Sequence, residues 1–252
     1  MNKHSAVDAQ NAAFYSADSR TYDAARFSDH AGTRETRRLH NLLARRLVGP
    51  RTFDQLIDVG CGTGRASEFL VQHTQSLTLV DISDEMVEAA RARCLSVRQD
   101  ALVDGVVSSV YSLPFEDESF TAAVSINLFS HLPDYVGALR EIGRVLKPGA
   151  PVVFSTPNLY SVYWPFGALV NRRKRALGYE VFSYWPSSST VRQALGDAGF
   201  LLAEVDGAVY LPRGARRIPL SDVVVHAADT VVSRWRTPAR VAPWLLWTAA
   251  KV

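Results

Sequence analysis

Three glycines at alternate positions, with two carboxylates nearby, are the residues in this chain best suited to chemistry. Gly60, Gly62 and Gly64 follow the apolar run 53–59, so they lie where a strand is expected to turn into a helix. Glycine allows a sharp turn there and a close approach of the backbone to a ligand. Parallel α/β sheets bind nucleotides at this end of their strands. The turn therefore predicts a nucleotide-like ligand.

The spacing of the glycines narrows the choice of ligand. A dinucleotide-binding turn has glycines at positions i, i+2 and i+5, and Arg65 occupies the last of these. Asp58 stands two positions before the first glycine, and a carboxylate there favours positive charge over a pyrophosphate. Asp81 comes about 20 residues after Gly60, which is the spacing at which an acid accepts hydrogen bonds from ribose hydroxyls. We predict a nucleoside that carries positive charge.

Strand and helix patterns alternate around this turn. Strands are predicted at 53–59, 77–80, 106–110, 120–126, 151–155, 200–205 and 244–252. Helices are predicted at 33–48, 65–73, 84–93, 134–146, 188–198 and 221–236. Repeated strand–helix units form a parallel sheet with right-handed crossovers and helices on both faces. The chain is expected to be an α/β protein.

Four sequence blocks resemble the class I S-adenosylmethionine-dependent methyltransferases, over residues 50–205. These blocks are LIDVGCGTGR (56–65), LTLVDISDEMVEAAR (77–91), SLPFEDESFTAAVSINLFSHLPD (112–134) and ALREIGRVLKPGAPVVFSTPN (138–158). The resemblance implies a Rossmann-like, doubly wound and mostly parallel seven-stranded sheet, with the seventh strand antiparallel. It also implies S-adenosyl-L-methionine as methyl donor and S-adenosyl-L-homocysteine as product.

On this basis the chain is expected to divide into four parts. These are an N-terminal helical lid (1–50), a cofactor-binding core (51–157), an inserted cap with the acceptor region (158–187) and the rest of the sheet and helices (188–252). Within the lid, Tyr15, Tyr22, Arg26 and Phe27 are candidates to cover the cofactor, because lids exclude water from the reaction. A loosely attached terminus is the alternative.

The resemblance also assigns cofactor contacts by position. The expected cofactor-binding residues are Asp58, Gly60, Cys61, Gly62, Gly64, Asp81, Ile82, Met86, Ser109, Val110 and Asn127. The glycines would line the methionine part, Asp58 would lie near its amino group, and Asp81 would hold the ribose. Ile82 and Met86 would flank the adenine. No metal site is predicted.

Ser109 departs from the pattern of the resembling family. Many members carry an acid at this position, which touches the adenine amino group. The hydroxyl of Ser109 can still accept one hydrogen bond. Asn127 is expected to contact the cofactor through its backbone or its amide.

His131 is the candidate catalytic base. It follows the predicted fourth strand at the edge where the acceptor should lie, and an ordinary histidine pKa of about 6.5 suits removal of a hydroxyl proton. The alternatives are that His131 caps the next helix or only shapes the cofactor pocket.

Two features of the cap bear on the acceptor. Aromatic residues that could line an apolar pocket are Tyr160, Tyr163, Trp164, Phe166, Tyr179, Phe182, Tyr184 and Trp185. Ordinary packing within the cap explains them equally well. The basic run 172–175 could meet an acidic acceptor, although such runs are usually solvated faces.

Composition limits the remaining choices. The formal net charge of +3, with no basic arm, speaks against nucleic acid as acceptor. Two cysteines, and no apolar run long enough to be a signal peptide or a membrane span, favour the cytoplasm. The expected partner is a small-molecule acceptor, and a homodimer is left open.

We expect methyl transfer to a small molecule, at a hydroxyl oxygen, in metabolite or natural-product biosynthesis. Three alternatives stay open. One is a non-catalytic cofactor-binding module, and another is a nicotinamide oxidoreductase, which the glycine spacing disfavours. The third is a lipid or quinone methyltransferase that rests on a membrane through the arginine-rich segment 213–247.

Overall fold

In a computed structural model of the chain, one sheet carries the architecture. The structure describes residues 8–9, 11–16, 22–23, 36, 39–49, 52–161, 165, 168–169, 172–173, 176, 184–208 and 242–252. Its strands are β1 (Phe53–Val59), β2 (Thr74–Asp81), β3 (Leu102–Val107), β4 (Ala122–Ser125), β5 (Pro151–Pro157), β6 (Phe200–Ala208) and β7 (Trp244–Lys251).

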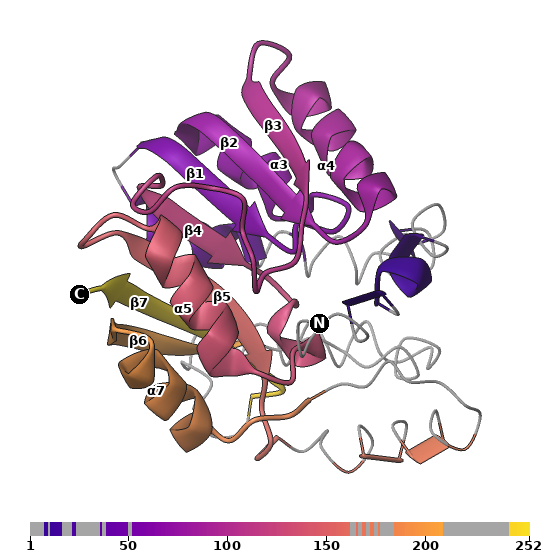
Figure 1. Cartoon of the computed structure of the whole chain (residues 1–252), viewed down its shortest axis with the longest axis vertical. Helices are drawn as coiled ribbons and strands as arrows, with labels where there is room; N and C mark the ends of the chain where they lie inside the picture. Colours follow the sequence, from indigo (N-terminus) through magenta and orange to yellow (C-terminus); the bar gives the residue numbers. More distant parts are fainter. Residues whose placement is uncertain are drawn as a thin grey trace, which may run out of the picture.

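The order of the strands confirms the predicted fold class. The seven strands lie in the order β3-β2-β1-β4-β5-β7-β6 (Figure 1). All pairs from β3 to β5 are parallel, and β7 is antiparallel to both β5 and β6. The chain thus forms a Rossmann-like, mostly parallel sheet in which the last strand is inserted in the opposite direction.

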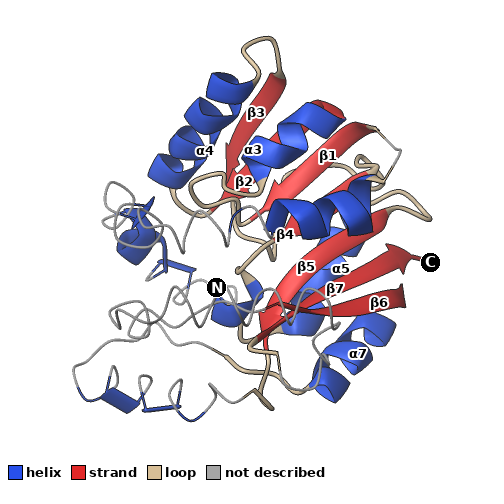
Figure 2. Ribbon diagram, turned by 180° about the vertical axis from the view of Figure 1, so that it is seen from behind, coloured by secondary structure: helices blue, strands red, loops and turns tan. Residues whose placement is uncertain are grey.

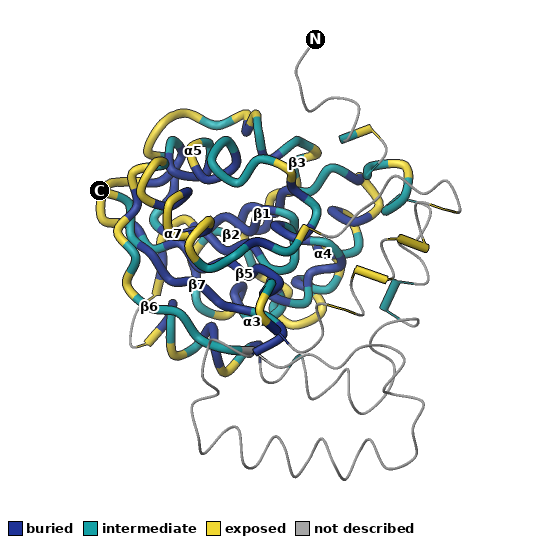
Figure 3. The backbone as a smooth tube through the Cα atoms, turned by 90° about the horizontal axis from the view of Figure 1, so that it is seen from below, coloured by how far each residue is buried: buried dark blue, intermediate teal, exposed yellow. Residues whose placement is uncertain are grey.

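Helices cover both faces of this sheet (Figure 2). On one face lie the short π-helix η1 (Ala44–Val48), α3 (Ser67–Leu70) and α4 (Asp84–Val97), whose apolar side chains share a core with one face of the strands. On the other lie α5 (Tyr135–Val145) and α7 (Ser188–Asp197), which form the second core. The central strands are buried between the two layers (Figure 3), which is why they read as nearly continuous apolar runs.

Helix caps lie where the sequence places them. The Ser83 hydroxyl accepts a hydrogen bond from the Met86 N–H and begins α4. Asp134 caps α5 in the same way, with its carboxylate accepting from the Gly137 N–H at 2.8 Å. The predicted alternative that His131 caps this helix is therefore wrong.

Several element boundaries differ from those predicted. The third strand runs over Leu102–Val107 and not 106–110, because this edge strand is largely exposed and lacks a continuous apolar signal. The predicted helix 65–73 shortens to α3 followed by the 3-10 helix η2 (Val71–His73). The fourth strand also shrinks at both ends, and Phe120 keeps only an isolated bridge to Leu146.

Some predictions lie wholly or partly outside the described residues. The helix predicted at 221–236, the residues Arg26 and Phe27, and most of the cap belong to this group, so the four-part division of the chain stays a prediction. Among the residues that the structure describes, no helix has the length and apolar character needed to cross a membrane. The same residues form no group of three or more His, Cys, Asp or Glu side chains placed to hold a metal ion.

Candidate cofactor and active site

The glycine turn after β1 is shaped by backbone conformation and close packing. Gly62 has a φ of +52° and Gly64 a φ of +79°, a region that side chains other than glycine rarely adopt. A Cβ on Gly64 would lie 2.7 Å from the Cα of Ala90, so α4 can pack directly on the turn. A Cβ on Gly62 would meet nothing within 4 Å. Gly62 therefore faces open space, where a ligand can approach the backbone.

Asp58 is a buried carboxylate at the end of β1. Its side chain is 1% exposed and lines the pocket beside the glycine turn. Burial raises the pKa of Asp58 to about 7; the hydrogen bond that Ser67 Oγ donates to it at 2.5 Å opposes this rise, and the nearby charge of Asp81 adds to it. Asp58 is thus poised to ionise when a positive charge arrives.

Asp81, at the end of β2, is fixed by the backbone. Its Oδ2 accepts from the Gly62 N–H at 2.9 Å, and its Oδ1 accepts from the Ser83 N–H at 3.2 Å. Burial raises the pKa of Asp81, and these backbone donors oppose the rise. Each oxygen keeps a further lone pair, so the carboxylate can still accept from two hydroxyls of one ribose.

The charge balance of this end of the pocket suits a cationic ligand. Among the described residues, neither Asp58 nor Asp81 forms an ion pair. Two buried carboxylates without a cation are costly, because each charge loses its hydration. A ligand with an amino group and a sulfonium would supply the missing charge, so these residues fit S-adenosylmethionine.

One pocket joins the predicted cofactor residues, with the exception of Gly64. It is lined by Asp58, Gly60, Cys61, Gly62, Asp81, Ile82, Met86, Ser109, Val110, Asn127 and His131, as predicted, and also by Asp8, Asn11, Tyr15 and Tyr22. Gly64 lies behind the turn, against α4, and is not part of this lining. The empty volume around these residues is about 1210 Å³, which includes space open to solvent.

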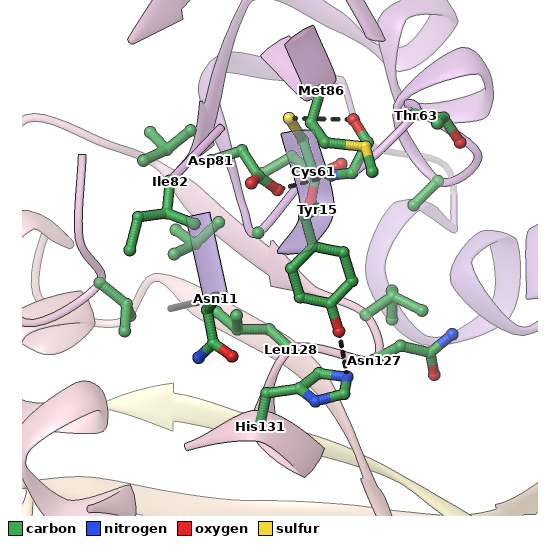
Figure 4. Close-up of a pocket in the computed structure, with 18 of the residues that line it drawn as sticks. Asn11, Tyr15, Cys61, Thr63, Asp81, Ile82, Met86, Asn127, Leu128 and His131 are labelled. Carbon is green, nitrogen blue, oxygen red and sulfur yellow. Dashed lines mark hydrogen bonds between the residues drawn. The ribbon is translucent and has the colours of Figure 1, made fainter. Parts of the chain in front are cut away.

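The opposite end of the pocket holds Asn127 and His131 (Figure 4). Asn127 has a φ of 64°, its N–H donates to Ser155 Oγ at 2.8 Å, and its C=O accepts from Ser130 Oγ at 2.9 Å. Its backbone groups are thus bonded within the protein, and its amide oxygen accepts from Ser155 Oγ at 3.3 Å, which leaves the amide nitrogen to face a ligand. His131 Nε2 lies 2.9 Å from the hydroxyl of Tyr15, which reaches across the pocket.

Known proteins are similar to this chain in sequence. The family described as "Methyltransferase domain" matches residues 57–154. A demethylmenaquinone methyltransferase of Staphylococcus aureus (strain JH9) is 32% identical over 178 residues, which cover 63% of this chain and 72% of the relative. The chain belongs to the class I S-adenosylmethionine-dependent methyltransferases. It uses S-adenosylmethionine as its cofactor, and the nicotinamide alternative is excluded.

Solved structures share the fold of this methyltransferase. Magnesium protoporphyrin IX methyltransferase from Synechocystis PCC 6803, with bound S-adenosylhomocysteine, superposes with a TM-score of 0.68 at 13% identity, covering 98% of this chain and 100% of that one. The [4+2]-cyclase SpnF superposes with a TM-score of 0.67 at 20% identity, covering 97% and 96%. Identities this low show the fold alone, and the second protein carries a different chemistry in its name.

Contacts from the N-terminal segment were only partly foreseen from the methyltransferase sequence. Tyr15 and Tyr22 line the pocket, as expected of a lid. The acid Asp8 was missed: its carboxylate accepts from Ser109 Oγ at 2.7 Å. Asp23 was missed as well, and it accepts from Thr63 Oγ1 at 2.8 Å in the glycine turn. Polar residues in a helical segment give no sequence signal for partners 40 or 101 positions away.

The predicted cap (158–187) is described only in part. Among its described aromatic residues, Tyr160 is 65% exposed, and neither Tyr184 nor Trp185 lines the cofactor pocket. The Tyr184 N–H donates to the Ser130 carbonyl at 2.7 Å, so this end of the cap is attached beside His131. In the basic run, Arg172 and Arg173 are exposed, as expected of a solvated face.

Proposed function

We propose that this methyltransferase transfers the methyl group to a hydroxyl oxygen of a small apolar molecule, with His131 as the base. The observation that carries the proposal is the position of Nε2, 2.9 Å from the hydroxyl of Tyr15 inside the pocket. A place that accommodates one hydroxyl at hydrogen-bond distance from an imidazole suits the hydroxyl of an acceptor equally well. The cofactor supplies an activated methyl group when it is bound.

The remaining residues would bind and orient. Asp58 would neutralise the amino group of the cofactor, Asp81 would hold its ribose hydroxyls, and the open face of Gly62 would admit its methionine part. In the reaction the acceptor oxygen forms a bond to the methyl carbon as the carbon–sulfur bond breaks. The hydroxyl proton passes to His131 Nε2 and then to solvent. Alignment and exclusion of water supply most of the acceleration, because the methyl group is already activated.

The test is product analysis with a panel of phenols, quinols and hydroxylated metabolites. We expect S-adenosylhomocysteine to form only with hydroxylated acceptors, and the new methyl signal to be that of a methoxy group in NMR. A methyl group found on carbon or nitrogen contradicts the proposal. Methylation of an oligonucleotide would also overturn our assignment of a small molecule over nucleic acid.

A quinone-type acceptor is the second candidate, favoured by the similarity to the demethylmenaquinone methyltransferase. It predicts a new carbon-bound methyl group on a demethylated naphthoquinol. A quinone-type acceptor also predicts association of the protein with a membrane surface, which sedimentation with anionic liposomes tests.

We further propose a cytoplasmic location, supported by two buried free thiols, Cys61 and Cys94.

A further inference from the structure

We propose that Asp8, in the N-terminal segment, supplies the carboxylate that recognises the amino group of the cofactor's adenine. The inference rests on the proposed placement of adenine beside Ile82, Met86, Ser109 and Val110, all of which line the pocket together with Asp8. The resemblance to the methyltransferase family implies an acid at position 109, where this chain has serine. In the structure, Asp8 places a carboxylate beside Ser109 from another part of the chain.

The direction of the hydrogen bonds at Ser109 is the first argument. Its hydroxyl donates its single proton to Asp8 Oδ2 at 2.7 Å and accepts from the Tyr111 N–H at 3.3 Å. A hydroxyl has one proton and two lone pairs. With one lone pair used, Ser109 is left as a single neutral acceptor, whereas the adenine amino group is a donor that prefers a charged one.

The acceptor capacity of Asp8 is the second argument. Among the residues that the structure describes, its carboxylate has one hydrogen-bond partner, which is Ser109. An ionised carboxylate accepts about four hydrogen bonds. Asp8 is half-buried at the pocket wall, so most of its acceptor capacity remains for a ligand.

The segment around Asp8 is also docked at several other points. Ser16 Oγ donates to Glu85 at 2.5 Å and lies 3.0 Å from Ser83 Oγ, at the start of α4. Tyr15 meets His131 on the opposite side, so the segment bridges both sides of the pocket. A base held by Asp8 would therefore be enclosed by the N-terminal segment, and recognition of adenine would be coupled to docking of that segment.

Calorimetry with two ligands tests the proposal on the full chain. S-Inosylhomocysteine differs from S-adenosylhomocysteine in carrying a carbonyl oxygen in place of the amino group. We expect the wild type to bind the adenosyl compound at least about tenfold more tightly, because a carboxylate repels the carbonyl oxygen. Asp8→Ala should weaken adenosyl binding about tenfold and change inosyl binding less than about twofold, so that discrimination disappears.

Two further variants separate recognition from docking. Ser16→Ala removes a docking contact away from the base, and it should affect both ligands equally. Asp8→Asn keeps the size of the side chain and adds a donor, and it should reduce discrimination as Asp8→Ala does. Equal losses for both ligands in Asp8→Ala, or unchanged discrimination, overturn the proposal. Failure of both ligands to bind the wild type would instead contradict the placement of the cofactor.

Discussion

The two ends of the pocket differ in how their side chains are held. At the glycine end (Asp58, Gly60, Gly62, Gly64 and Asp81), every group lies at the end of β1 or β2 or in the turn after β1. The hydrogen bonds that hold the two carboxylates come from this turn, from Ser67 in α3 and from the start of α4. At the lid end (Asp8, Tyr15, Ser109 and His131), the contacts join residues that lie more than a hundred positions apart in sequence. The groups proposed to hold the methionine part and the ribose of the cofactor are thus built into the sheet, whereas those proposed for the adenine and the acceptor depend on a docked segment.

Replacement of Gly62 should produce the largest effect at the glycine end. A valine there must adopt a φ of about +52° and fill the open face of the turn, so Gly62→Val should weaken S-adenosylhomocysteine binding by more than about a hundredfold. Gly149→Val is the matched control, because Gly149 also has a positive φ and open surroundings but lies outside the pocket. Similar loss of ligand binding in the control would mean that backbone strain alone explains the effect.

His131→Ala tests the lid end. If the imidazole removes the acceptor proton, turnover should fall by roughly 10²–10⁴, while the affinity for S-adenosylhomocysteine stays within about threefold. His73, whose Nδ1 lies 3.0 Å from the Phe69 carbonyl, provides the control substitution. A turnover loss below tenfold removes His131 from the role of base. A parallel loss of affinity for S-adenosylhomocysteine would mean that His131 also contributes to cofactor binding, so that the two ends of the pocket would not have separate roles.

Asp81→Ala should have an intermediate effect, confined to cofactor affinity. Loss of hydrogen bonds to a charged group costs about 1.5–3 kcal/mol, or roughly 10- to 150-fold in the dissociation constant. Asp104→Ala, on the exposed edge strand β3, is the matched control. Calorimetry checks both variants, and unchanged affinity in Asp81→Ala would refute the assignment of the ribose to this residue.

The pH dependence of cofactor binding should be the smallest effect. In the free protein the pKa of Asp58 is about 7, so its carboxyl is mostly protonated below that pH, whereas a ligand amino group favours the ionised form. Affinity for S-adenosylhomocysteine should therefore be highest above pH 7 and fall by up to about tenfold for each unit below it. The dependence should flatten in Asp58→Asn. Affinity that is constant from pH 8 to pH 5.5 in the wild type speaks against contact between Asp58 and the amino group.

The glycine end could be predicted almost completely from the sequence. The strand Phe53–Val59 and the start of α4 after Ser83 were found because buried strands and capped helices leave local patterns. The edge strand β3 was misplaced because most of its residues are exposed and Asp104 and Gly105 interrupt the apolar run. Local spacing therefore identifies elements that are packed on both faces.

The lid end could be predicted only in outline. His131 was found because it follows a buried strand, but its bond to Tyr15 and the bond between Asp8 and Ser109 depend on where a distant segment docks. No spacing along the chain encodes such contacts.

A crystal structure with bound S-adenosylhomocysteine tests the arrangement of the pocket most directly. We predict that the amino group of the ligand lies at Asp58, that its ribose hydroxyls bond to Asp81, and that its sulfur points toward the space in front of His131. A ligand bound with its ribose away from Asp81, or with its sulfur turned from His131, would contradict both the cofactor assignment and the placement of the acceptor.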